Sequence, residues 1–133
     1  MSPGWSSGYG LFTKGEAPLV SSYTTSPAYH VEYGEGDRFK AVIFEEGHVM
    51  QVEGAGITAG TKNETYAKMF IEFLISDEAQ AAIPLTQWMF PVNKNVELPD
   101  SYKTASPIPA KTLDYDCSKL DSVVQNIMNI INE

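Results

Sequence analysis

The strongest constraint on the fold is a short apolar stretch that ends in hydroxyl residues and leads directly into a helix start. Residues 17–23 contain Leu19 and Val20 and are typical of a short buried strand. Ser26 and Pro27 follow as a helix start, because serine is a favoured N-cap and proline is favoured at the first helical position. Such a junction brings free backbone N–H groups and side-chain hydroxyls to one point. That point can hold a polar ligand atom, and an anionic one best.

Two tyrosines flank this junction, Tyr23 at the end of the predicted strand and Tyr29 in the first helical turn. They can pair around a flat or cationic group, because aromatic faces attract both. The alternative is a strand–helix junction whose tyrosines only pack. This stretch by itself leaves both interpretations open.

The spacing of Trp5, Tyr9 and Phe12 predicts a short helix over residues 5–14, with Gly15 as its stop. An aromatic stripe at this spacing faces a core more often than a ligand. Phe12 is therefore assigned to the core, while Trp5 stays a site candidate and Tyr9 is left undecided.

Two extended stretches follow the junction helix. Residues 39–44 are predicted to form a strand and residues 49–57 a second extended run, with Gly47 in the break between them. A plain hairpin within one domain is one explanation of this pair, and the sequence alone does not exclude it.

The clearest helix signal begins at Thr61, where Glu64 three residues later matches a capping box. One face of this helix carries apolar side chains at helical spacing, namely Tyr66, Phe70, Phe73 and Leu74. A second short helix is predicted to start at Ser76 and to end at Pro84. We interpret this helix pair as scaffold.

The last third of the chain changes composition. Residues 88–92 are predicted to be extended, and residues 93–111 contain three prolines and form a surface connection. Residues 118–131 predict an amphipathic helix. Its apolar face, expected to cover a sheet, consists of Leu120, Val123, Val124, Ile127 and Ile130.

Composition narrows the function classes. The chain has 133 residues, of which 43% are apolar and 20% charged, the balance of an ordinary globular domain. A net charge of −8 leaves no basic patch for a nucleic-acid partner. The sequence has no apolar run of about 18 residues to predict a membrane span. Residues 1–4 lack the basic and apolar regions of a signal peptide.

Candidates for catalysis and metal binding are few. Cys117 is the single cysteine, and no histidine lies near it in the sequence to act as a base. His30 and His48 show none of the short paired spacings of zinc sites. No catalytic residue, metal ligand or cofactor is therefore assigned.

Several phrases of the sequence carry a resemblance to one family. They are Gly4-Trp5-Ser6, Tyr9 to Phe12 with Lys14-Gly15-Glu16, Ser22 to His30, Glu46-Gly47-His48, Gln51-Val52-Glu53, Ala82-Ile83-Pro84, Trp88-Met89 and Pro91-Val92. On these phrases the chain resembles the periplasmic thiamine-binding proteins, the solute-binding components of thiamine ABC transporters. The resemblance runs from about Gly4 to Asn93.

The resemblance implies an α/β fold, as part of a class II periplasmic-binding-protein-like fold with strands flanked by helices. It places residues 1–40 in one lobe with the aromatic ligand-binding segment, residues 41–52 at the crossing between lobes, and residues 53–133 in the other lobe. A secreted receptor carries a signal peptide. We therefore expect the chain to be the C-terminal portion of a longer, two-lobed protein, without its N-terminal half.

The resemblance also implies a function. The chain is expected to bind thiamine or a thiamine phosphate ester outside the cytoplasm, in the periplasm, and to serve an ABC transporter permease without catalysing a reaction. The ligand-binding residues that it implies are Trp5, Tyr23, Thr25, Ser26, Tyr29 and Trp88. The missing N-terminal half is a further expected partner, and its absence is expected to make the chain self-associate through uncovered edges and apolar faces.

Two alternatives stay open at this point. A ferric-ion or other small-solute binder of the same fold would use tyrosinates, and Tyr23 and Tyr29 are available for that role. A thiaminase-I-like, thiamine-degrading enzyme would need a nucleophilic cysteine. Cys117 lies in no motif typical of one, and its role is left open.

Overall fold

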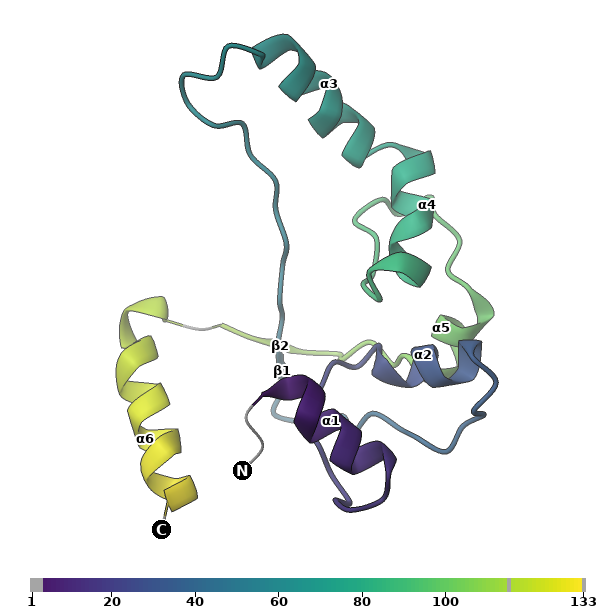
Figure 1. Cartoon of the computed structure of the whole chain (residues 1–133), viewed down its shortest axis with the longest axis vertical. Helices are drawn as coiled ribbons and strands as arrows, with labels where there is room; N and C mark the ends of the chain where they lie inside the picture. Colours follow the sequence, from purple (N-terminus) through teal and green to yellow (C-terminus); the bar gives the residue numbers. More distant parts are fainter. Residues whose placement is uncertain (1–3, 115, 133) are drawn as a thin grey trace. The chain divides into compact units, whose positions relative to one another are not determined.

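The structure, a computed structural model, describes residues 4–114 and 116–132 (Figure 1). These residues form mainly helices, with one two-stranded parallel sheet. The elements in chain order are α1 (Trp5–Thr13), α2 (Ser26–Glu32), β1 (His48–Val49), α3 (Glu64–Leu74), α4 (Asp77–Thr86), α5 (Asp100–Ala105), β2 (Thr112–Leu113), the 3-10 helix η1 (Cys117–Lys119) and α6 (Leu120–Asn132).

Contacts within the chain divide it into two units, which are described separately. The larger unit holds residues 4–42 and 53–108, with α1 to α5, and the smaller holds residues 43–52 and 109–132, with the sheet and α6. The lobe assignment made from the sequence concerns a two-lobed parent protein and stays a prediction.

The larger unit has a small core where α2 packs against α5. Ala28 of α2 and Tyr102 of α5 are 0% and 1% exposed, which makes this contact the best-buried part of the unit. The Tyr102 hydroxyl donates a hydrogen bond to the Pro84 carbonyl at 2.7 Å, and the ring meets Phe90 edge-on at 5.4 Å. Burial raises the pKa of Tyr102 to about 12. The core therefore ties α2, α4, α5 and the chain after α4 together.

Gln80 is the buried polar residue that fixes the segment after α4. Its Nε2 donates to the Leu74 carbonyl at the end of α3 at 2.7 Å. Its Oε1 accepts from the backbone N–H groups of Val92 at 2.8 Å and Asn93 at 3.3 Å. Because Gln80 is only 5% exposed, these bonds satisfy groups that water does not reach.

The smaller unit is built on a short parallel pairing, with His48 opposite Thr112 and Val49 opposite Leu113. Gly47 precedes it at φ +115°, and a Cβ there would lie 3.1 Å from the Lys111 carbonyl oxygen, so the turn requires glycine. The Asp116 carboxylate accepts from the Ser118 N–H at 3.0 Å and starts the final helical stretch.

The helix predicted over residues 5–14 is confirmed as α1, and the expected N-cap of Ser76 is confirmed because its hydroxyl accepts from the Ala79 N–H at 3.3 Å. The helix predicted over residues 118–131 is confirmed as α6 with η1 before it.

The predicted strand over residues 17–23 is wrong, since this stretch pairs with no other described segment. The prediction of Ser26 as the N-cap is also wrong. Thr25 is the N-cap and Ser26 already belongs to α2, with Pro27 one position later than expected. The Ser26 hydroxyl instead lies 2.7 Å from the Ser22 hydroxyl, so it is engaged by a neighbouring side chain rather than by the helix N-terminus.

The strand predicted over residues 39–44 is wrong, and of the run 49–57 only Val49 lies in a strand. The hairpin alternative is wrong as well, because β1 pairs in parallel with β2, far along the chain. Apolar runs of this kind form strands only when a partner supplies the hydrogen-bond ladder. The described residues supply such a ladder only at β1 and β2.

The capping box at Thr61 is wrong, because α3 begins at Glu64 with Asn63 as its N-cap and no side-chain cap. The Thr61 hydroxyl accepts from the Asn63 N–H instead. Pro84 does not end the second helix, which continues to Thr86. The connection at 93–111 contains α5, which the sequence analysis missed.

Apolar side chains of α3 and α6 are exposed. The exposed apolar residues are Tyr66, Met69, Phe70 and Phe73 on α3, and Leu120, Val124, Ile127, Met128, Ile130 and Ile131 on α6. The self-association expected from the sequence stays a prediction, and these side chains are where it would act.

Candidate functional site

A series of aromatic rings begins on α1. Trp5 stacks on Tyr9 with centroids 4.9 Å apart and planes at 25°, and Tyr23 meets Trp5 at 6.3 Å. The Tyr9 ring lies nearly parallel to the His30 ring of α2, at 5.8 Å and 14°. Trp5 and Tyr9 are four residues apart on one helix face, which is why their rings meet. We call Trp5, Tyr9 and Tyr23 the first branch.

A second group of rings continues from the other side of His30. The Tyr29 ring lies edge-on to the His30 ring, with centroids 5.4 Å apart. The centroid of the Tyr29 ring also lies 4.7 Å from that of Tyr33 and 5.0 Å from that of Trp88. Trp88 also lies 6.1 Å from Tyr33, so the three rings contact one another. We call Tyr29, Tyr33 and Trp88 the second branch, and the two branches with His30 the ring series.

The backbone after α4 places Trp88 in the second branch. Trp88 has φ +55°, a left-handed conformation that is uncommon for a residue other than glycine. Such a conformation persists where surrounding contacts hold it. Here the ring contacts of Trp88 and the Gln80 hydrogen bonds to residues 92 and 93 hold it from both sides.

His30 carries the polar contacts of the ring series. It is 3% exposed, its Nε2 lies 2.7 Å from the Tyr9 hydroxyl, and its Nδ1 lies 3.0 Å from Oε2 of Glu35. Both ring nitrogens of this buried histidine therefore have a hydrogen-bond partner. Burial raises the pKa of Tyr9, as do the charges of Glu35 and Tyr29, whereas a hydrogen bond with Ser26 lowers it.

Four of the six predicted ligand residues are members of the ring series, namely Trp5, Tyr23, Tyr29 and Trp88. Trp5, Tyr23 and Tyr29 are 52%, 56% and 41% exposed, so ring surface is open to a ligand.

The two predicted hydroxyl residues are less open than these rings. Thr25 is 6% exposed, while Ser26 is half-buried and bonded to Ser22.

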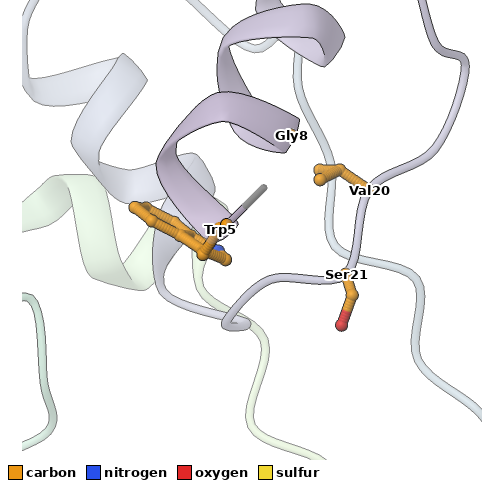
Figure 2. Close-up of a pocket in the computed structure, with 5 residues that line it drawn as sticks. Trp5, Gly8, Val20 and Ser21 are labelled. Carbon is orange, nitrogen blue, oxygen red and sulfur yellow. The ribbon is translucent and has the colours of Figure 1, made fainter. Parts of the chain in front are cut away.

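An open pocket of about 370 Å³ adjoins the first branch. It lies between the first turns of α1 and the extended segment before α2, and it is lined by Gly4, Trp5, Gly8, Val20 and Ser21 (Figure 2). Gly4 and Gly8 have no Cβ, so the helix surface there is bare backbone. The pocket therefore adds a concave surface beside an exposed indole.

Three members of the ring series were not assigned to the site from the sequence, namely Tyr9, His30 and Tyr33. Tyr33 is four residues after Tyr29, and this spacing on a helix was a usable signal for a shared face. Tyr9, left undecided, lies between Trp5 and His30.

The arrangement offers aromatic faces and few ionic groups. Within residues 4–114 and 116–132, no three His, Cys, Asp or Glu side chains gather to hold a metal ion. In the same residues, no helix is long and apolar enough to cross a membrane. Exposed tryptophan and tyrosine faces attract flat rings and cations.

Comparison with known proteins places the chain in a family. Residues 2–110 match the model of the bacterial extracellular solute-binding proteins. The chain belongs to this family. Its periplasmic-binding-protein-like fold is thereby shown, and the ring series is a solute-site candidate within it. No solved structure matches the chain significantly.

Curated relatives share about half of the matched residues. A "Thiamine-binding periplasmic protein" from Brucella abortus is 50% identical over 85% of this chain and 34% of its own length. The protein of the same name from Escherichia coli is 48% identical over 84% of the chain and 34% of its length. A third, from Haemophilus influenzae, is 48% identical over 67% of the chain.

The chain thus spans about a third of the length of the first two relatives and about a quarter of the third. The names of the three relatives describe binding proteins, and none refers to iron or to a thiamine-degrading activity.

Proposed function

We propose that this chain is the ligand-contacting part of a thiamine receptor in the class II periplasmic-binding-protein fold. The observation that carries the proposal is the ring series, a connected set of ring contacts that includes four aromatics of the predicted site. The three relatives described above, all named thiamine-binding, support it.

The chemistry of thiamine fits the aromatic faces of the ring series. Thiamine joins a flat aminopyrimidine to a thiazolium cation, so a receptor needs stacking faces and a π surface for positive charge. Trp5, Tyr23, Tyr29 and Trp88 supply such faces, at about 0.5–2 kcal/mol for each cation–π contact. The net charge of −8 adds a mild preference for a cationic ligand.

Hydroxyl groups are proposed to add polar contacts. Ser26 is half-buried and opens α2, next to the buried Thr25. A thiamine phosphate ester would present an anionic group to such hydroxyls. The proposal therefore includes both thiamine and its phosphate esters as ligands.

The wider role follows from the family. We propose that the full protein works outside the cytoplasm, in the periplasm, and delivers thiamine to an ABC transporter permease. The ligand would be enclosed when two lobes close around it, a hinge motion common in such receptors. The rest of the protein would supply the surface opposite the ring series, and no reaction is part of this role.

Tryptophan fluorescence tests the proposed contact. The grafted receptor, in which this chain replaces the matching third of the Escherichia coli relative, is titrated with thiamine. Saturating thiamine is expected to quench emission, and the quench should shrink in the variants Trp5→Phe and Trp88→Phe. If both variants keep the full quench while calorimetry confirms binding, neither indole contacts the ligand.

A further inference from the structure

His30 joins the two branches of the ring series. Its ring meets Tyr9 of the first branch nearly parallel, at 14°, and Tyr29 of the second branch edge-on, at 88°. Phe39, which is 8% exposed, closes the inner side at 4.2 Å. Among the ring contacts of the described residues, the link between the branches passes through this one imidazole.

Hydrogen bonds fix the imidazole at both nitrogens. Glu35 accepts at Nδ1, so the neutral ring carries its proton there and leaves Nε2 to accept from the Tyr9 hydroxyl. These two bonds determine how the ring is turned. The bond at Nε2 also sets the position of the Tyr9 ring, on which Trp5 stacks.

We propose that Tyr9 and His30 are positioning residues, whose hydrogen bond holds the two branches in the mutual alignment that the ligand requires. This inference rests on the proposed thiamine-binding function. His30 is buried, so it acts through the rings on either side of it and not by touching the ligand.

The bond aligns rings that are not in the same helix. Trp5 and Tyr9 belong to α1, whereas Tyr29 belongs to α2, and the side-chain hydrogen bond of Tyr9 to His30 connects these helices directly. Without it, the direct bond between Tyr9 and the imidazole is lost, and packing of aromatic rings allows a wider range of angles than a hydrogen bond does. A ligand that stacks on both branches would then meet rings that are less ordered.

The structure offers a matched control for the test. Tyr102→Phe removes a hydroxyl that donates to the Pro84 carbonyl at 2.7 Å, the same length as the Tyr9–His30 bond. Tyr102 is more deeply buried than Tyr9, and its ring contact is with Phe90, outside the ring series. Each variant removes a tyrosine hydroxyl that forms a 2.7 Å hydrogen bond, but only Tyr9→Phe loosens the link between the branches.

The first readout is thiamine affinity of the grafted receptor, measured by calorimetry well below the unfolding temperature. Tyr9→Phe is expected to raise the Kd about fivefold or more, the scale of one lost hydrogen bond. Tyr102→Phe should lower the unfolding midpoint and leave the Kd within about twofold. His30→Gln, whose amide can both donate and accept, should keep more affinity than His30→Leu. Equal Kd values for Tyr9→Phe and Tyr102→Phe would overturn the proposal.

The second readout does not depend on ligand binding. Stacked Trp5 and Tyr9 rings are expected to give a coupled near-ultraviolet circular dichroism signal in the 133-residue chain. Tyr9→Phe should change the tryptophan part of this signal, and His30→Leu should change it in the same way, while Tyr102→Phe should not. If the unsubstituted grafted receptor does not bind thiamine, the proposed function fails and this signal still decides the positioning role. A signal that is unchanged in both Tyr9→Phe and His30→Leu contradicts it.

Discussion

Replacement of Tyr29 by alanine is expected to weaken thiamine binding by about 1–3 kcal/mol, or about 5- to 150-fold in Kd. Tyr29 is 41% exposed, so its replacement removes one aromatic face that a ligand can contact. It also removes the ring contacts of Tyr29 with Tyr33 and Trp88, which help to hold those two rings in place. Tyr29→Phe should cost little, because the proposed contact is made by the ring face, which phenylalanine keeps. Calorimetry on the grafted receptor measures both values.

Tyr66→Ala is the control for this comparison. Tyr66 is a tyrosine on α3 that is 73% exposed and lies outside the ring series, so its removal should leave thiamine affinity unchanged. A Tyr29→Phe variant as weak as Tyr29→Ala would show that the hydroxyl carries the interaction. The ferric-ion alternative would then gain support over stacking.

Gln80→Leu is expected to lower the free energy of unfolding by about 2–4 kcal/mol. The change keeps a side chain of similar size but removes hydrogen bonds to the backbones of Leu74, Val92 and Asn93. These backbone groups lose their partner where Gln80 is 5% exposed, and each unsatisfied buried group is costly. Urea unfolding of the 133-residue chain measures the effect.

Gln87→Leu provides the matched control. Gln87 is an exposed glutamine that ends α4 through its backbone N–H, so the substitution should change stability by less than about 0.5 kcal/mol. Similar unfolding midpoints for the two variants would show that the Gln80 bonds do not hold the segment that leads from Trp88.

Local signals in the sequence predicted the helices best. The aromatic spacing of α1, the Ser76 cap of α4 and the apolar spacing of α6 depend on neighbours within a few residues. The start of α3 failed, although Thr61 and Glu64 matched a capping pattern. That pattern fixes only residue types, and the Thr61 hydroxyl satisfied the Asn63 N–H instead.

Structural features that depend on contacts between distant parts of the chain could not be predicted from the sequence. The apolar runs at 17–23 and 39–44 form strands only beside a partner strand, which the described chain does not give them. The six-residue helix α5 is short for a helix to be stable alone, and it packs on α2. Pro84 is tolerated within α4, where it is buried and its carbonyl accepts the Tyr102 hydroxyl.

The aromatic part of the candidate site was predictable in composition but not in geometry. The sequence predicts Trp5, Tyr23, Tyr29 and Trp88 as ligand residues, and the structure includes all four in one ring series. The role of His30 as the link depends on side chains from three segments meeting. The left-handed backbone at Trp88 likewise has no signature in the sequence.

Calorimetric titration of the grafted receptor with thiamine is the most direct test of whether this chain contacts the ligand. The parent Escherichia coli relative, under the same conditions, shows what an intact site gives. We expect one thiamine to bind per grafted receptor, with affinity within about tenfold of the parent because the aromatic faces of the site are present. No heat of binding from a folded grafted receptor, while the parent binds thiamine, would show that this chain does not contact thiamine as proposed.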